Sequence, residues 1–354
     1  MRLGLNTMKA AINFGYWGNG PNQTVEMVKH AESLGYDSVW TSEASGTDAV
    51  SPLAFLAAHT TKIKLGTAIM QIAGRSPGTT AMTAVTLDLL SGGRFILGLG
   101  VSGPAVVEAW HSQPYGKPIK KSREYIEIVR MIIARQGLVE YHGEHYDVPY
   151  MREGSTGLAS PIKLMCRPRR PRIPIWLAAM GPRNVRMALE TCDGIMPPIY
   201  SPSKEAGLFA QYEDDRAEID AARERNGLKP ECEVAPFVPI ASGADLQRCR
   251  DKMKPAVAFW LGAMGPKENN FYNNLARRFG YEDEALQIRD LYADGRRSEA
   301  AAAVPDSMVD EVCLVGPREH IAEQLEAWKA SRVTTLILTG PTKEELELIA
   351  ELVL

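Results

Sequence analysis

The stretch from residue 63 to residue 104 constrains the fold more than any other part of this sequence. It contains two short apolar runs, Ile63–Ile72 and Phe95–Val101, which are bounded by Lys, Gly and Pro, as is typical of strands buried on both faces. Between them, Thr80–Leu90 follows a Pro-Gly pair and stops at Ser-Gly-Gly, a pattern that predicts a helix. A strand, a helix and a second strand in this order form a right-handed parallel unit.

The same alternation continues along the rest of the chain. Predicted strands lie at Leu3–Asn6, Asp37–Thr41, Ile63–Ile72, Phe95–Val101, Ile175–Ala179, Asp193–Met196, Cys232–Ile240 and Thr334–Leu338. Because no change in composition marks a linker, we expect one domain over residues 1–354, of class α/β, folded as a (β/α)₈ TIM barrel.

Two segments interrupt the alternation and are expected as insertions after strands four and seven. The first, about residues 138–172, contains a hairpin-like run and a cluster of basic residues, and the second, about 245–305, is mainly helical. One helix is expected over Ser307–Ser331. The alternative fold is a doubly wound sheet, because residues 98–103 match G-x-G-x-x-G. That motif should follow a first strand, however, and here it follows the fourth, so the barrel is favoured.

Composition limits the possible partners. The chain has 354 residues, of which 45% are hydrophobic and 23% charged, with a net charge of -3, so neither nucleic acid nor a membrane surface is expected as a partner. Its five cysteines show no spacing typical of a metal site or a disulfide framework, and we interpret them as reduced thiols. The sequence opens on a strand-like run without an apolar signal segment, so a cytoplasmic protein is expected.

A barrel collects its ligands at the carboxyl ends of its strands. Two clusters there, Ser102-Gly103-Pro104 and Gly181–Asn184, combine small residues with a helix start. A free helix N-terminus presents backbone N–H groups and partial positive charge, and so it can bind a phosphate or another anion. Ordinary turn chemistry explains either cluster alone, whereas two clusters at the same end favour an anionic cofactor.

Glu43 follows the second predicted strand and is the one obvious acidic residue expected at the carboxyl ends of the strands. It is the candidate general acid or base. The alternative is a structural role as partner of Arg75 or of a neighbouring backbone amide, and the sequence does not decide between the two. Among the histidines, His111 is the one expected near this end, and no Ser/His/Asp order stands out.

Several motifs together resemble the bacterial luciferase-like monooxygenase superfamily. They are Leu65-Gly66-Thr67-Ala68-Ile69, Leu90-Ser91-Gly92-Gly93-Arg94-Phe95, Leu97-Gly98-Leu99-Gly100, Ala179-Met180-Gly181-Pro182 and Asp193-Gly194. More narrowly, the sequence is similar to the branch of F420-dependent oxidoreductases found in actinobacteria and to the methylenetetrahydromethanopterin reductases. This resemblance covers nearly the whole chain and implies the same (β/α)₈ barrel.

The resemblance also implies a cofactor, coenzyme F420, with FMN as the alternative. It predicts a cis peptide bond at Ala68–Ile69 behind the deazaflavin ring, a phosphate near Gly181–Asn184 and a ribityl chain along Val101–Gly103. Together with the positions at the strand ends, the expected cofactor-binding residues are Asn6, Glu43, Thr67, Ala68, Ile69, Val101, Ser102, Gly103, Met180, Gly181, Pro182, Arg183, Asn184, Ile199 and Tyr200. The basic run Lys163–Arg172 is expected to attract the acidic tail of F420, which FMN lacks.

One departure from the family bears on the reaction. Sugar-phosphate dehydrogenases of this family have a His at the end of strand two and a Glu after strand four, and the matching positions here are Glu43 and Gly103. The resemblance therefore implies hydride transfer between the deazaflavin C5 and a small organic substrate with an activated C=C, C=O or imine group. The alternatives are a reduced-FMN-dependent monooxygenase and a non-catalytic flavin-binding protein.

A homodimer is expected from the same resemblance. Barrels of this family pair through helices after the early strands, here Pro52–Thr60 and Thr80–Leu90, whose apolar content exceeds what one barrel face needs.

Overall fold

The computed structural model describes residues 8–17, 21–268 and 270–354. The strands are β1 (Lys9–Asn13), β2 (Ser38–Thr41), β3 (Lys64–Thr67), β4 (Met70–Gln71), β5 (Phe95–Gly100), β6 (Tyr141–His142), β7 (Asp147–Val148), β8 (Ile175–Leu177), β9 (Gly194–Ile195), β10 (Glu233–Val234), β11 (Phe237–Ser242), β12 (Leu314–Gly316) and β13 (Thr335–Thr339). All except the β6–β7 hairpin belong to one parallel sheet, which confirms the predicted α/β class.

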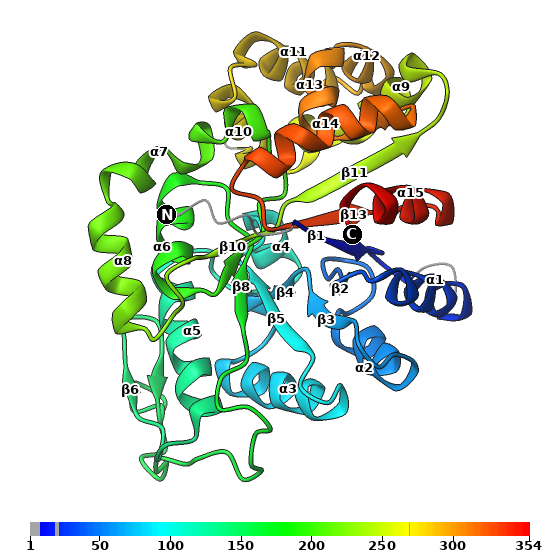
Figure 1. Ribbon diagram of the computed structural model, residues 1–354. Coiled ribbons are helices and arrows are strands. Elements are labelled where there is room, and N and C mark those ends of the chain that lie inside the picture. The colour runs from blue at the N-terminus through cyan, green and yellow to red at the C-terminus, as the bar shows by residue number, and fades with distance from the viewer. Residues whose placement is uncertain (1–7, 18–20, 269) are drawn as a thin grey trace.

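The α-helices alternate with these strands over most of the chain (Figure 1). They are α1 (Pro21–Leu34), α2 (Val50–His59), α3 (Pro77–Leu90), α4 (Pro104–Ala109), α5 (Pro118–Ala134), α6 (Pro182–Thr191), α7 (Ala206–Asp214), α8 (Arg216–Arg225), α9 (Leu246–Ala263), α10 (Phe271–Arg278), α11 (Glu282–Ala293), α12 (Arg297–Ala302), α13 (Asp306–Val312), α14 (Arg318–Ala330) and α15 (Lys343–Val353). Short 3₁₀ turns lie at Ile72–Gly74 and Pro202–Lys204.

The sheet is curled, and its strand order is β10-β9-β8-β5-β3-β2-β1-β13-β11-β12, with β4 paired to β5. Only two residues separate β10, which pairs with β9, from β11, which pairs with β13. In addition, Ala235 N–H donates to Ile195 O over 2.9 Å and Ile337 N–H donates to Pro236 O over 3.0 Å. The segment from residue 233 to residue 242 is therefore bonded to strands on both sides.

The first strand differs from the prediction. The position beside β2 belongs to β1, Lys9–Asn13, which pairs with β13 and β2, whereas the predicted Leu3–Asn6 lies outside the described residues. The prediction missed β1 because two alanines have weak strand propensity. Four of its five residues are buried nonetheless, since the curled sheet surrounds them. The helix expected in Ser307–Ser331 is α14, but the prediction missed α13 and β12, which precede it there.

Two glycines of the predicted motifs allow a close approach at the centre of the sheet. A Cβ atom at residue 66 would lie 2.3 Å from the Trp40 ring, and one at residue 98 would lie 1.8 Å from the Thr67 carbonyl oxygen. Trp40 stacks on Trp176 with ring centroids 4.9 Å apart, and both side chains belong to an inner apolar cluster. Any larger residue at these two positions would separate β3 from its neighbours.

The motif at residues 90–95 has a structural role, which depends on Arg94. Its guanidinium donates hydrogen bonds to the carbonyl oxygens of Ala57, Thr60, Ile63 and Ser91, so it joins the end of α2 to the start of β5. Gly92 and Gly93, which precede it, have φ angles of 70° and 91°, a conformation that favours glycine. The turn between α3 and β5 is thus built to place this arginine.

The basic run lies at the opposite end of the sheet from the one predicted. Arg170 pairs with Asp88 and donates to the carbonyl of Phe95, the first residue of β5, while Arg172 pairs with Asp193, just before β9. The run therefore packs against the amino ends of the strands. The expectation that it attracts a cofactor tail at the carboxyl ends is wrong, because an insertion that leads into β8 enters the sheet at its amino end.

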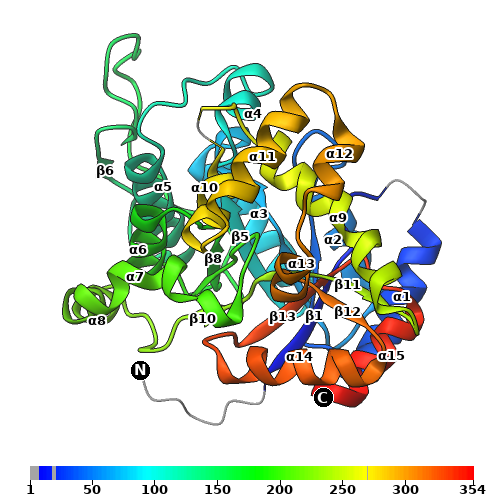
Figure 2. The ribbon, with the colours of Figure 1, turned by 90° about the horizontal axis from the view of Figure 1, so that it is seen from above.

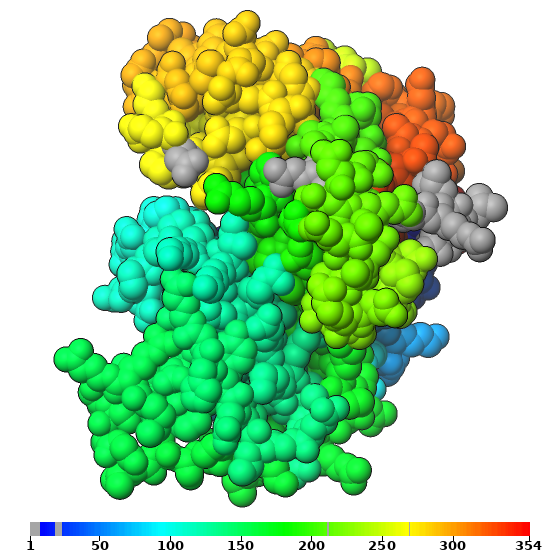
Figure 3. Space-filling view, turned by 90° about the vertical axis from the view of Figure 1, so that its left-hand side faces the viewer, coloured from blue at the N-terminus to red at the C-terminus, as the bar shows by residue number. Residues whose placement is uncertain are grey.

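The helices after β11 lie at the other end of the sheet. Figure 1 shows α9 to α13 as a group above the sheet, and in Figure 2 the same group lies over it. In Figure 3 this group, yellow to orange, forms the upper part of the face. Arg278 of α10 donates to the carbonyl of Met180, which follows β8. Of the helices that the structure describes, none is long and apolar enough to cross a membrane.

Candidate functional site

Most of the predicted site segments meet at the carboxyl end of the parallel sheet. Hydrogen bonds and close packing join Thr67–Ile69 after β3, Val101–Gly103 after β5 and Met180–Asn184 after β8 through the strands that precede them. A Cβ atom at residue 100 would lie 2.5 Å from Ile69, and the Ala178 N–H donates to Leu99 O over 2.9 Å. The loops after parallel strands were expected to meet at the carboxyl end of the sheet, and these three segments do.

The Thr67–Ile69 segment contains the predicted non-proline cis peptide bond, between Ala68 and Ile69. The Thr67 hydroxyl donates to Gly98 O over 2.7 Å and accepts from Gly98 N–H over 2.9 Å, and the side chain is completely buried. Thr67 therefore connects β3 to β5. Ala68 and Ile69, whose side chains lie in or against the inner cluster, form a wall at this end.

Open space adjoins two of the predicted glycines. Gly103 precedes the short helix α4, and Gly181 is the N-cap residue of α6; a Cβ atom at either would meet no heavy atom within 4 Å. Neither N-cap position carries a side-chain hydrogen bond. Ser102, between β5 and α4, has a φ angle of 62°, in the left-handed region.

The start of α6 is rich in donors and poor in acceptors. Its first turn contains Pro182, Arg183 and Asn184 and no acidic residue, and the first N–H groups of a helix have no acceptor within it. Asn184 donates to Ala178 O over 3.3 Å, whereas its Oδ1 is buried without a hydrogen-bond partner in the part of the chain that the structure describes. A ligand with a hydroxyl group would satisfy this oxygen.

Glu43 contacts Arg75 and neighbouring backbone amides, the partners expected if its role is structural. Arg75 donates to both carboxylate oxygens, over 2.6 and 2.8 Å, and the backbone N–H groups of Gln71 and Ala49 donate over 3.1 and 3.4 Å. Only 11% of the Glu43 side chain and 20% of the Arg75 side chain are exposed. The ion pair also raises the pKa of Arg75. Both oxygens of Glu43 are thus occupied within the protein.

Two other predicted residues, Ile199 and Tyr200, offer no free polar group here. Both are buried, and the Tyr200 hydroxyl donates to Glu205 while its ring packs against Trp328. Asn6 lies outside the described residues. The asparagine that ends the strand is Asn13, whose Oδ1 accepts from the Gly15 N–H over 2.9 Å.

Sequence reasoning expected His111 near this end of the sheet but missed its partner, Gln71. Gln71 on β4 is 1% exposed, and its Oε1 contacts His111 Nε2, while the other end of its amide has no partner among the described residues. It also missed Arg278, which lies far from Met180 in the sequence but contacts it in space. No local pattern marks either residue, because each depends on which distant segment packs beside it.

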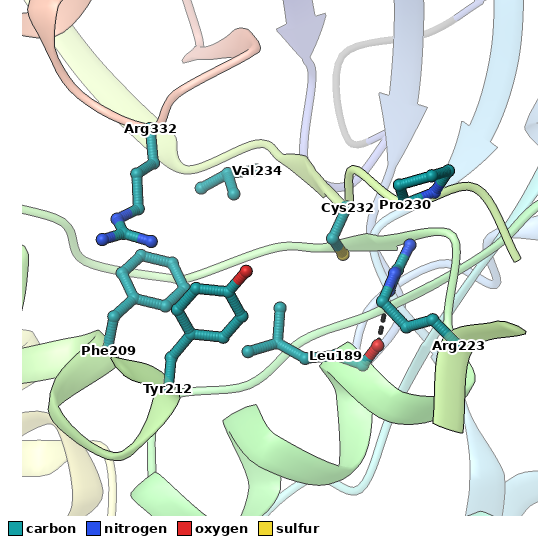
Figure 4. Close-up of a pocket in the computed structure, with 8 residues that line it drawn as sticks. All are labelled: Leu189, Phe209, Tyr212, Arg223, Pro230, Cys232, Val234 and Arg332. Carbon is teal, nitrogen blue, oxygen red and sulfur yellow. Dashed lines mark hydrogen bonds between the residues drawn. The ribbon is translucent and has the colours of Figure 1, made fainter. Parts of the chain in front are cut away.

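The hollows found elsewhere do not fit a substrate site. One cavity, of about 20 Å³, lies between α6, α7, α8 and β10, and Figure 4 shows Arg223 donating to the Leu189 carbonyl there. That volume holds about one water molecule. A second hollow, of about 620 Å³, lies on the outer faces of α5, α6 and α8 and is open to solvent. The described residues contain no group of three or more His, Cys, Asp or Glu that is placed to hold a metal ion.

Comparison with known proteins decides the family. The model of the family described as luciferase-like monooxygenase matches residues 1–335. The chain belongs to this family. It is 41% identical over 347 residues, 98% of this chain and 99% of the relative, to a Mycobacterium tuberculosis protein named "Putative coenzyme F420-dependent oxidoreductase Rv3520c". The resemblance predicted from the sequence motifs is thereby confirmed.

More distant relatives agree with this membership. The chain is 25% identical over 335 residues, 92% of each chain, to a 5,10-methylenetetrahydromethanopterin reductase of Archaeoglobus fulgidus. Its fold is similar to that of the coenzyme F420-dependent tetrahydromethanopterin reductase of Methanopyrus kandleri, with a TM-score of 0.77, 22% identity and 98% of both chains covered.

Proposed function

We propose that this chain is a coenzyme F420-dependent oxidoreductase that transfers a hydride between the deazaflavin C5 and a small organic substrate carrying an activated C=C, C=O or imine group. The observation that carries the proposal is the 41% identity, over nearly the whole of both chains, to a relative named for F420. When bound, the cofactor supplies hydride chemistry at C5. The residues of this chain supply the binding surface.

The segments after β3, β5 and β8 support a deazaflavin site. Ala68 and Ile69 provide an apolar wall for a ring, and Gly103 and Gly181 leave open space where side chains would obstruct a ligand. The uncapped N-terminus of α6 suits a phosphate. The unpartnered Asn184 oxygen suits a ribityl hydroxyl.

The contacts of Glu43 support a positioning role over proton transfer. A carboxylate that accepts two hydrogen bonds from Arg75 must break them before it can carry a proton. We therefore propose that Glu43 fixes the backbone at Gln71, next to the proposed ring wall, and that water supplies the proton.

The barrel is also a proposal. The inner cluster takes one residue from each of eight successive strand positions, namely Ala11, Trp40, Ala68, Ile96, Trp176, Met196, Ala235 and Ile337. Mutual contact of such a set is expected in the interior of a closed (β/α)₈ barrel. We place its insertions at about 138–172 and 245–305, within one domain.

A homodimer remains the expected assembly. Large apolar side chains on the outer faces of α2 and α3 are exposed, at 41% for Phe55, 53% for Met82, 46% for Leu89 and 58% for Leu90. A second copy of the chain would cover them. All five cysteines are free, which supports the proposal of a reducing, cytoplasmic location.

Parallel titrations with F420 and FMN, followed by absorbance and fluorescence, test the function. We expect F420 to bind more tightly than FMN, and Gly181→Val to weaken F420 binding by filling the open space. Gly137→Val is the matched control, because Gly137 also adjoins open space but follows α5, at the other end of the sheet. Tighter binding of FMN with oxygen-dependent turnover would replace the proposal with a monooxygenase. Binding of a flavin without any turnover would favour a flavin-binding protein.

A further inference from the structure

Arg278, the last residue of α10, contacts two backbone carbonyl oxygens. Its Nη2 donates to Met180 O over 2.6 Å and its Nε to Gly207 O over 3.1 Å. No Asp or Glu of the described chain lies within ion-pair distance of it, whereas its neighbour Arg277 pairs with Glu282. The residue is exposed at the surface, and the local desolvation of its guanidinium lowers its pKa.

The helix next to this arginine contains a second cation in its first turn, Arg183. The carbonyl that Arg278 holds belongs to Met180, which directly precedes the N-cap residue of α6. Arg183, at the second position of that helix, is exposed and has no hydrogen bond or ion pair among the described residues. The helix dipole favours acidic residues in the first turn. The first turn of α6 has a basic residue there and no acidic one.

The two carbonyl contacts also orient the guanidinium. They use Nε and Nη2, whereas Nη1 has no hydrogen bond within the part of the chain that the structure describes. A guanidinium fixed in this way is well suited to a phosphate, which accepts from several donors at once.

We propose that Arg278 is a phosphate-binding residue, contributed to the cofactor site by the helices that follow β11. This inference rests on the proposed function for the identity of the cofactor, since it assigns Arg278 to the phosphate expected at Gly181–Asn184. It also gives those helices a role in ligand binding, because Arg278 pairs with no carboxylate of the described residues, whereas Arg75, in the loop after β4, is already paired with Glu43.

The test compares three ligands and three proteins. F420, F420 freed of its glutamate tail, which keeps the phosphate, and the precursor that ends at the ribityl chain, which lacks both, are titrated by fluorescence against the parent, Arg278→Met and Arg277→Met at low and high salt. We expect Arg278→Met to weaken both phosphate-containing ligands about ten- to a hundred-fold, as for loss of a charge-assisted hydrogen bond, and to change precursor binding less than about two-fold. The salt dependence of F420 binding should also decrease. A loss confined to F420 with its tail would assign Arg278 to the tail and overturn the inference. Arg277→Met should change the binding of none of the three ligands.

The outcomes separate the two proposals. Equal loss of F420 and precursor in Arg278→Met would assign Arg278 a structural role and overturn the inference, as would an unchanged F420 affinity. A parent that binds none of the three deazaflavins overturns the proposed function. If the parent prefers FMN, the same comparison between FMN and riboflavin decides the role of Arg278 independently.

Discussion

Replacing Glu43 with Gln separates its two possible roles. In the parent, both carboxylate oxygens of Glu43 accept hydrogen bonds. Glutamine keeps one oxygen and replaces the other with an NH₂ group, which cannot accept, so Arg75 loses at least one of its contacts of 2.6 and 2.8 Å. A hydrogen bond to a charged group contributes about 1.5–3 kcal/mol. Because 20% of Arg75 is still exposed to water, the loss stays below the roughly 3–5 kcal/mol of a fully buried pair. We expect the free energy of unfolding to fall by about 2 kcal/mol.

Urea unfolding of the parent, Glu43→Gln, Arg75→Met and the double variant measures this value. The two residues contact each other, so the double variant should lose less than the sum of the single changes. Glu299→Gln is the control, since the Arg296–Glu299 pair is 52% and 59% exposed and should leave the urea midpoint unchanged. An unchanged stability in Glu43→Gln, together with a turnover reduced about 10²–10⁴-fold that Arg75→Met does not share, would refute the positioning role and identify Glu43 as the acid or base.

Three further predictions follow from the described contacts. Maleimide should label one thiol of the native protein, the exposed Cys166, and all five after unfolding, because burial raises the pKa of Cys192 to about 11 and that of Cys232 to about 12. Burial raises the pKa of Asp193, but Arg130 and the Ile175 N–H outweigh this effect and lower the pKa overall. The parent should therefore be more stable than Asp193→Asn at pH 7, and this difference in the free energy of unfolding should decrease as the pH falls below about 4. Leu90→Glu combined with Met82→Glu should give a monomer mass by light scattering without a loss of stability, whereas Leu158→Glu, on a side chain 87% exposed elsewhere, should leave the dimer intact.

The alternation of strands and helices was readable because most strands of a parallel sheet are buried on both faces and therefore appear as continuous apolar runs. Phe95–Gly100, buried at every residue, is the clearest case. The misplaced first strand shows the limit of this pattern. Lys9–Asn13 is a strand because β13 and β2 pair with it on either side, and this tertiary pairing has no local signature.

The candidate site was predictable by segment and less so by side chain. Parallel topology alone brings Val101–Gly103 and Met180–Asn184 to one end of the sheet. The direction of each side chain depends on its neighbours: Thr67 turns to the backbone of Gly98, and Tyr200 turns to Glu205. Arg278 reaches the site from a helix nearly a hundred residues beyond Met180, a contact that no spacing in the sequence announces.

The glycines of the family motifs divide into two physical classes, and this division predicts opposite phenotypes. Gly98 faces the backbone of the adjacent strand, where a Cβ atom would lie 1.8 Å from Thr67 O, and a backbone atom inside a sheet cannot move aside as a side chain can. We expect Gly98→Ala to cost at least the roughly 1–3 kcal/mol typical of overpacking, and to lower the urea midpoint accordingly. Gly181→Ala, where the added methyl group meets no atom within 4 Å and the φ angle of -83° is compatible with alanine, should leave the midpoint unchanged. Equal stability of the two variants would show that the close approach of β3 and β5 is not what requires glycine at position 98.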